Sequence, residues 1–134
     1  FNTIVNQVSD RKLALLENKR VGVNINLLQK GGEYRWHYDR NEVTVVLYLN
    51  QVQGGNIEFY PNYRFDLRKN RFNRIQQYLD SFIQLKFMRQ IFGKKLSVAP
   101  APGKLLIMQA NRCLHSVSPV EDDQTRISII MAYN

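Results

Sequence analysis

Histidine, cysteine and long hydrophobic runs are all scarce in this chain of 134 residues, which has two histidines and one cysteine, Cys113. A single cysteine forms no internal disulfide and leaves too few thiolates for a cysteine-rich zinc site. It is compatible with a reducing compartment, so we expect an intracellular protein. No run of 18 apolar residues is present, and the sequence therefore predicts no membrane-spanning helix.

Acidic residues are also few, 11 against 19 Lys and Arg, which gives a formal net charge of +8. Residues 61–95 contain nine of these cations and only two acids, so almost all of the surplus lies in one segment. The favoured interpretation of this segment is a solvated helix face over an apolar stripe that caps the barrel. The alternative is a lid or docking surface for an acidic substrate or partner, with nucleic acid as the less favoured choice.

Short apolar segments separated by glycine and proline turns dominate the rest of the chain. Eight of them are predicted strands: 21–28, 33–38, 44–50, 56–60, 95–100, 104–110, 114–120 and 126–133. This number of short strands is typical of a β-sandwich or barrel.

Helical spacing occurs in two places. A loose apolar face predicts a helix within residues 2–18, and a stronger one predicts an amphipathic helix over 70–92 that Gly93 ends. The apolar positions of the second helix are Phe72, Ile75, Leu79, Ile83, Phe87 and Ile91. We expect one domain over 1–134, with an N-terminal helical segment (1–20), barrel strands (21–60 and 96–134) and a basic helical insert (61–95).

The stretch RWHYDRNE contains the first of the two histidines, His37, two residues before Asp39. On a strand these side chains project from one face and could hold one ion, whereas Tyr38 would face away. His115, the other histidine, follows a predicted strand and could complete a set of two histidines and one carboxylate. That set suits non-haem Fe(II). The spacing of His37 and Asp39 alone does not exclude an ordinary strand histidine.

Arg126 begins an otherwise apolar predicted strand, and Ser128 shares its face. A buried arginine needs an anionic partner, because an unpaired buried charge is costly. The planar guanidinium matches a carboxylate. Arg126 and Ser128 therefore predict a receptor for one end of a small dicarboxylic acid.

These segments together resemble a known family. HYD at 37–39, TVVLYLN at 44–50, GGNIEFYP at 54–61, PAPGKLLIM at 100–108, and CLHSVSPV followed by TRISIIMAY resemble the Fe(II)/2-oxoglutarate-dependent oxygenases, most closely the prolyl-hydroxylase-like branch. The resemblance implies a mainly β fold, the double-stranded β-helix, which is a jelly-roll or cupin-like barrel. Relatives carry more helix before the barrel than 20 residues supply, which raises the expectation of a longer protein.

The resemblance also implies roles for individual residues. His37, Asp39 and His115 would bind Fe(II). The cosubstrate 2-oxoglutarate would be bound by Arg126, Tyr48, Ser128 and Val117. Many relatives carry a tyrosine near the position of Leu28, whose side chain cannot donate a hydrogen bond, and Asn24 or Asn26 could replace it.

The implied activity is hydroxylation of an unactivated C–H bond in an amino acid, a peptide or protein side chain, or a small metabolite. Such a reaction consumes O2, releases succinate and CO2, and often uses ascorbate as a reductant. Halogenating relatives carry a small residue at the position of Asp39, so an aspartate there favours hydroxylation.

Three further residues are candidates for substrate binding: Trp36, Glu58 and Arg112. For Trp36 and the nearby Tyr34, packing on the outside of the barrel is the favoured interpretation. Two other functions stay open. One is a non-catalytic β-barrel that docks an acidic partner or nucleic acid through its basic insert, and the other is a cupin-type metalloenzyme without a cosubstrate.

Overall fold

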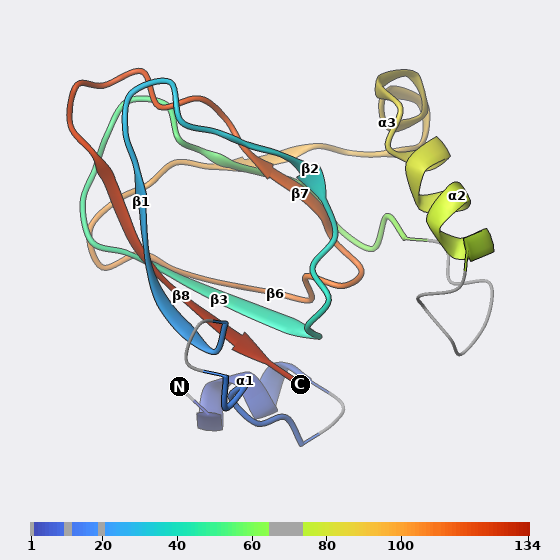
Figure 1. The fold of residues 1–134 in the computed structure, drawn as a ribbon, viewed down its shortest axis with the longest axis horizontal. Coiled ribbons are helices and arrows are strands. Elements are labelled where there is room, and N and C mark those ends of the chain that lie inside the picture. Colours follow the sequence, from blue (N-terminus) through green and yellow to red (C-terminus); the bar gives the residue numbers. More distant parts are fainter. Residues whose placement is uncertain (1, 10–11, 19–20, 65–73) are drawn as a thin grey trace.

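Eight strands form two four-stranded antiparallel sheets that face each other in a computed structural model, which describes residues 2–9, 12–18, 21–64 and 74–134 (Figure 1). One sheet has the order β1-β8-β3-β6, formed by Val23–Leu28, Arg126–Tyr133, Val43–Tyr48 and Leu105–Met108. The other has the order β2-β7-β4-β5, formed by Tyr34–His37, Leu114–Val117, Ile57–Tyr60 and Leu96–Val98. All eight predicted strands are present, and the fold is a double-stranded β-helix.

Strand β3 is apolar except for Thr44, because both of its faces are covered. Its inward residues Val46 and Tyr48 pack between the sheets, with Ile57 and Val117 of the opposite sheet. Its outward residues pack against α1 (Asn2–Val8) and the chain that follows it. Continuous hydrophobicity is the pattern expected of a strand that is buried on both sides.

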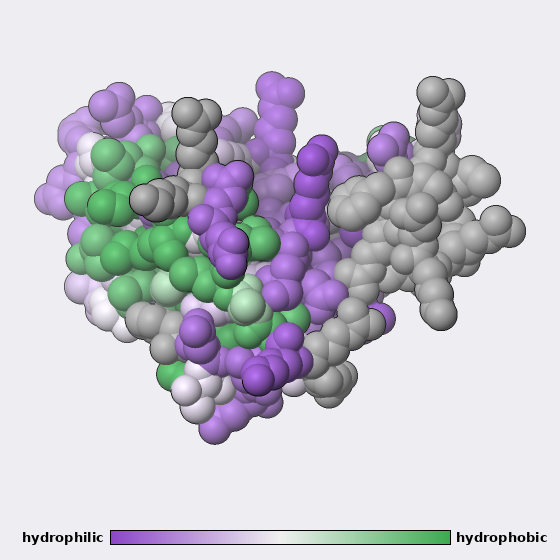
Figure 2. Space-filling model, turned by 60° about the horizontal axis from the view of Figure 1, so that its bottom comes forward, coloured by the Kyte–Doolittle hydropathy of each residue, from purple (hydrophilic) through white to green (hydrophobic). Residues whose placement is uncertain are grey.

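The outer face of β1, at one edge of this sheet, is exposed. On β1 the inward side chains are half-buried, whereas Ile25 and Leu27 are 66% and 60% exposed. Figure 2 shows a hydrophobic area on this face of the molecule. Helix α1 therefore covers only part of the sheet (Figure 1).

The N-terminal segment differs from the helix expected within 2–18. Helix α1 ends at Val8, and Leu15 instead forms a β-bridge with Tyr133. Backbone hydrogen bonds join Ala14 to Asn134 in both directions. These contacts extend the edge of β8 beyond its pairing with β1, because unpaired backbone groups there require partners.

The insert contains two helices where one was expected over 70–92: α2 (Arg74–Ile83) and α3 (Lys86–Phe92). Leu85, in extended conformation, precedes α3 and interrupts the apolar stripe. Ile83 is buried against the barrel, whereas Phe87 and Ile91 are 68% and 55% exposed. Phe72 and the side chain of Ile75 lie outside the described residues.

Gly93 ends α3 as expected, but the reason is close contact with the barrel and not a left-handed backbone conformation. Gly93 donates its N–H to the Arg89 carbonyl with an extended backbone, φ −127°. A Cβ at this position would lie 2.4 Å from the Tyr60 ring. The chain can therefore pass this close to the barrel only because residue 93 has no side chain. None of the described helices is long and apolar enough to cross a membrane.

Candidate active site

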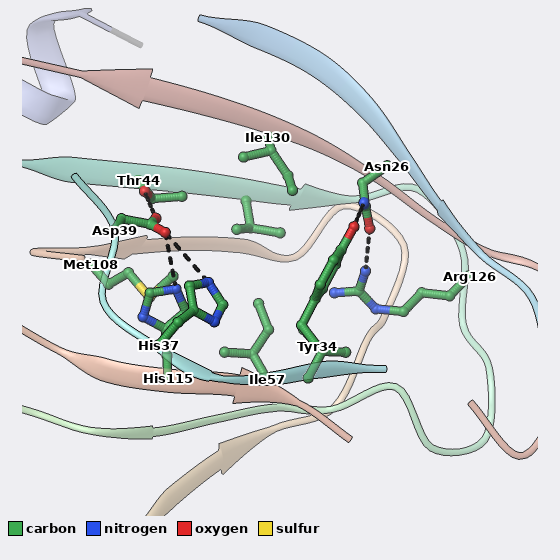
Figure 3. A pocket seen from close by; sticks show the side chains of 12 residues that line it. Asn26, Tyr34, His37, Asp39, Thr44, Ile57, Met108, His115, Arg126 and Ile130 are labelled. Carbon is green, nitrogen blue, oxygen red and sulfur yellow. Dashed lines mark hydrogen bonds and ion pairs between the residues drawn. The ribbon is translucent and has the colours of Figure 1, made fainter. Parts of the chain in front are cut away.

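Three potential metal ligands meet at one end of the space between the sheets (Figure 3). His37 of β2 and His115 of β7 are directly paired across the second sheet, and their ring centroids are 4.3 Å apart. Both Nε2 atoms lie 3.5 Å from Oδ1 of Asp39. One ligand atom from each residue can be chosen so that all lie within 4.8 Å of one another. The side chains can therefore surround a single ion.

Asp39 lies two residues beyond the end of β2, not on the strand itself. Its backbone N–H donates to the Ala110 carbonyl at 3.2 Å, which holds the loop against the neighbouring segment. The common orientation of His37 and Asp39 therefore depends on this loop contact as well as on strand alternation.

Backbone carbonyls orient both imidazoles. Nδ1 of His37 lies 2.6 Å from the Arg35 carbonyl, and Nδ1 of His115 lies 2.8 Å from the Cys113 carbonyl. A carbonyl oxygen only accepts, so each Nδ1 donates to its carbonyl, and each Nε2 is the ring atom that lies on the side of Asp39. Hydrogen bonds of this kind fix the tautomer and the direction of metal-binding histidines.

The second oxygen of Asp39 has its own support. Thr44 donates its hydroxyl to Oδ2 at 2.6 Å, and the Asn41 amide donates to the Thr44 hydroxyl at 2.8 Å. Burial alone would raise the pKa of Asp39, but hydrogen bonds from His115 and His37 outweigh it and hold the pKa well below its usual range. Asp39 is therefore an ionised carboxylate with one oxygen directed at the histidines.

Arg126 occupies the other end of the same space and is 1% exposed. Its Nε donates to the Gly55 carbonyl at 2.9 Å, and its Nη1 donates to Ser128 Oγ at 3.1 Å and Asn26 Oδ1 at 3.3 Å. All of these acceptors are neutral. Among the residues that the structure describes, no carboxylate pairs with Arg126. A buried guanidinium without a counter-charge is the strongest sign here of an anionic ligand.

Tyr48 adds a second incomplete group beside this arginine. The Arg126 guanidinium lies 5.0 Å from the centroid of the Tyr48 ring. Burial raises the pKa of Tyr48, and its buried hydroxyl has no hydrogen-bond partner among the described residues. A bound carboxylate is one group that could satisfy both side chains.

A cavity of about 160 Å³ connects the histidine end with the arginine end. Its middle is apolar, formed by Val46, Ile57, Val117 and Ile130, while Thr44 and Asn26 lie toward the two polar ends (Figure 3). The cavity can thus hold a small molecule that is charged at its ends and contacts hydrocarbon between them.

Tyr34 lines this cavity, whereas the sequence favoured packing on the outside of the barrel. Its hydroxyl accepts a hydrogen bond from the Asn26 amide near Arg126 (Figure 3). Tyr34 and His37 are an odd number of residues apart, so regular alternation would place them on opposite faces. The β2–β7 register shifts between them, and such a bulge allows both side chains to face the cavity. A bulge of this kind leaves no clear mark in the sequence.

Gly55 has a role in the site that the sequence motifs did not predict. It has φ +62°, and a Cβ there would lie 2.7 Å from Cδ of Arg126. The second glycine of the Gly54-Gly55 turn therefore makes room for the arginine, and its carbonyl orients that side chain. The pair of glycines in the sequence was the available signal, but it was interpreted only as a turn.

The three candidate substrate residues do not line this cavity. Trp36 packs against Tyr60, and the Arg89 guanidinium lies 4.3 Å from the Trp36 ring centroid, which matches the packing interpretation. Glu58 pairs with Lys95 at 2.7 Å. Arg112 is exposed in a turn. Roles in substrate binding for these residues stay predictions.

The basic insert is partly held to the barrel by its own cations. Arg64 pairs with Asp80 of α2, and its Nη1 donates to the Asn111 carbonyl at 3.1 Å. Arg89 and Lys95 contact Trp36 and Glu58 as described above. Tyr38, as expected, is directed toward this insert, where its hydroxyl donates to the Tyr63 carbonyl at 3.2 Å. These cations are accounted for by internal contacts, and docking of an acidic partner to the insert stays a prediction.

Comparison with protein families matches residues 23–134 to the 2OG-Fe(II) oxygenase superfamily, and the chain belongs to this family of oxidoreductases. Its cofactors are Fe(II), 2-oxoglutarate and O2. A comparison with curated protein sequences gives no significant match.

Solved structures share the fold. A prolyl-4-hydroxylase from Pseudomonas putida is 20% identical with a TM-score of 0.55, over 84% of this chain and 50% of that one. A prolyl hydroxylase from Trichoplax adhaerens, in complex with a hypoxia inducible factor peptide fragment, is 21% identical with a TM-score of 0.54, over 83% and 42%. AviO1 from Streptomyces viridochromogenes Tue57 is 14% identical with a TM-score of 0.66, over 98% and 55%. The chain thus spans about half the length of these structures.

The two ends of the cavity fit the cofactors of this family. The histidine and carboxylate donors are suited to Fe(II) with positions left for further ligands. The unpaired Arg126 and the unsatisfied Tyr48 hydroxyl are suited to the distal carboxylate of 2-oxoglutarate.

Proposed function

We propose that this chain is the catalytic barrel of an Fe(II)- and 2-oxoglutarate-dependent hydroxylase that oxidises an unactivated C–H bond. One observation carries the proposal: a His-Asp-His cluster and a buried arginine without an acidic partner occupy opposite ends of one small cavity. A dicarboxylic acid that binds metal at one end and arginine at the other satisfies both.

Each end of the cavity has a separate task in this proposal. His37, Asp39 and His115 hold Fe(II) through Nε2, Oδ1 and Nε2. Arg126 binds the distal carboxylate of 2-oxoglutarate, with Ser128 and Tyr48 completing the polar contacts, and Val117 packs against its carbon chain. When bound, Fe(II), 2-oxoglutarate and O2 together supply the oxidation that yields succinate, CO2 and a hydroxylated substrate.

Two features of the chain support these assignments. The Asp39 carboxylate occupies the position where halogenating relatives have a small residue, which favours hydroxylation. The Tyr34 hydroxyl lies near Arg126 and, together with Asn26, supplies the polar groups that Leu28 cannot. We assign Tyr34 and Asn26 to cosubstrate binding.

The substrate is an amino acid, a peptide or protein side chain, or a small metabolite. Peptide substrates are supported by the peptide complex of the Trichoplax adhaerens prolyl hydroxylase, which shares the fold. An intracellular location, suggested by the single cysteine, is part of the same proposal.

Binding and turnover can be tested separately. Calorimetry should detect Mn(II), used as a redox-stable substitute for Fe(II), and then 2-oxoglutarate on the metal-loaded chain. Incubation with Fe(II), ascorbate and 2-oxoglutarate should release succinate. His115→Ala should lose metal binding and succinate release together. A folded wild-type chain that binds neither Mn(II) nor 2-oxoglutarate would rule the proposal out.

A further inference from the structure

A second cavity lies next to the candidate metal site, on the side of the insert. It has a volume of about 240 Å³ and shares His37 and Asp39 with the cavity described above. Tyr38 and Arg40 come from the same loop, and α2 and the residue after it contribute Gln77, Asp80 and Gln84. A molecule in this cavity therefore lies beside the metal ligands without entering the space between the sheets.

The wall formed by the insert is held in place by buried charges that cancel each other. Arg64 donates to both oxygens of Asp80, and the side chains are 5% and 12% exposed. Gln76 donates to the same carboxylate at 2.8 Å, and the Arg64 guanidinium lies 5.0 Å from the Tyr38 ring centroid. These contacts make a rigid wall with no net charge.

One charge in this cavity is not cancelled. The Asp39 carboxylate faces the two histidines and would be balanced by the metal ion that they hold together, and Arg64 is paired with Asp80. Arg40 is exposed and has no acidic partner among the described residues. The cavity therefore attracts anions.

The remaining polar groups can donate and accept hydrogen bonds. The side-chain amides of Gln77 and Gln84 line the cavity, and within the described part of the chain neither has a hydrogen-bond partner. A free amide recognises the carbonyl, amide or hydroxyl group of a ligand. The volume of the cavity, about 240 Å³, is appropriate for one small molecule.

We propose that this cavity is the substrate pocket and that it selects a small carboxylate-bearing molecule, such as an N-acylated amino acid. Arg40 pairs with the carboxylate, while Gln77 and Gln84 bind the polar groups next to it. The inference rests on the proposed function, because it uses the position of the metal to define which cavity receives the substrate.

The paramagnetic relaxation that bound Mn(II) causes in the NMR signals of small probe molecules tests this proposal directly. The chain is loaded with Mn(II) and saturated with 2-oxoglutarate, so that the Arg126 end is occupied. N-acetylglycine and N-acetylglycinamide are then compared, because they have nearly the same shape and differ in charge. We expect the methyl protons of N-acetylglycine to be relaxed roughly threefold more strongly, with the difference shrinking in about 0.5 M salt.

Three variants locate the anion site. Arg40→Gln should abolish the preference for N-acetylglycine, and Gln77→Glu should abolish or reverse it by adding a negative charge. Lys12→Gln, which removes an exposed cation outside the cavity, should keep it. Equal relaxation of the two probes in the wild-type chain overturns the proposal, as does a preference that survives Arg40→Gln or disappears in Lys12→Gln.

Two further outcomes separate the competing explanations. A capped acidic peptide, acetyl-Gly-Glu-Gly-amide, should be relaxed less than N-acetylglycine, and equal relaxation would replace the small molecule with a peptide side chain. Failure to bind Mn(II) or 2-oxoglutarate rejects the proposed function itself. If both bind and the probes are not distinguished, only the inference about the substrate fails.

Discussion

The two cavities that meet at His37 and Asp39 are built in opposite ways. In the cavity between the sheets, each end has buried polar groups, such as His115 and Arg126, and Arg126 is held by hydrogen bonds to Gly55 and Asn26 from distant segments. In the cavity beside α2, Arg40 and Gln77 are exposed, and Gln77 belongs to a helix of the insert and not to a strand of the barrel. Cofactor chemistry needs fixed geometry, whereas a pocket for substrate can be changed by a few side chains on an insert.

The largest effect on metal affinity is expected from replacing Asp39, which lines both cavities. Asp39→Ala removes the carboxylate that faces both histidines, so affinity for Mn(II) should fall by more than about 100-fold, because loss of groups that merely support ligands already costs 10–100-fold. Asp123→Ala, which changes an exposed carboxylate that pairs with Lys30, is the control. Calorimetry measures both, and unchanged affinity in Asp39→Ala would remove Asp39 from the metal site.

Replacing the arginine should affect only the inner cavity. Arg126→Gln should weaken binding of 2-oxoglutarate roughly 30-fold or more, because loss of one partner of a buried charged pair costs about 2–5 kcal/mol. Affinity for Mn(II) should stay within about threefold of wild type, since the metal site lies at the other end of the cavity. Equal losses for metal and cosubstrate would show that the two ends do not act separately.

The support behind Asp39 should have a smaller effect. Thr44→Val keeps the shape of the side chain but leaves Asp39 Oδ2 without its hydrogen bond, so affinity for Mn(II) should fall about 10-fold. Thr44→Ser retains the hydroxyl and should restore most of the affinity. Calorimetry with both variants separates this positioning role from packing, because a purely structural contribution would be disturbed by the serine as well.

The smallest effect should be confined to the insert. Asp80→Asn removes the charge that pairs with Arg64 and should destabilise α2 locally by about 1–3 kcal/mol. Hydrogen exchange followed by mass spectrometry should show faster exchange in α2 and unchanged exchange in β3. If β3 exchanges faster as well, the insert is part of the barrel's cooperative unit, and the contrast between the two cavities is not valid.

Strand periodicity and residue chemistry anticipated much of the molecule. The eight strands were evident because β-branched and apolar residues alternate with glycine and proline turns. His37, Asp39, His115 and Arg126 could be selected because histidines are few in this chain and an arginine is out of place in an apolar strand. These features depend on residue type and local spacing, which a sequence displays directly.

Other features depended on contacts that are distant in sequence. The bulge that directs Tyr34 into the cavity arises from pairing between β2 and β7. The need for glycine at Gly55 arises from the path of Arg126, which lies 71 residues further along the chain. The break between α2 and α3 leaves Phe87 exposed although its spacing fits the apolar stripe.

The β architecture, the family resemblance and the candidate residues for Fe(II) and dicarboxylate binding could be predicted from the amino-acid sequence, because hydrophobic period and side-chain chemistry are local properties. Which of these groups share a cavity and which cations pair with acids became evident from the tertiary structure, since both depend on strand register and on charges from distant segments. Arg64 and Arg40 illustrate the difference. Both are arginines in polar stretches of sequence, but one is neutralised by Asp80 and the other faces the open pocket beside the metal ligands.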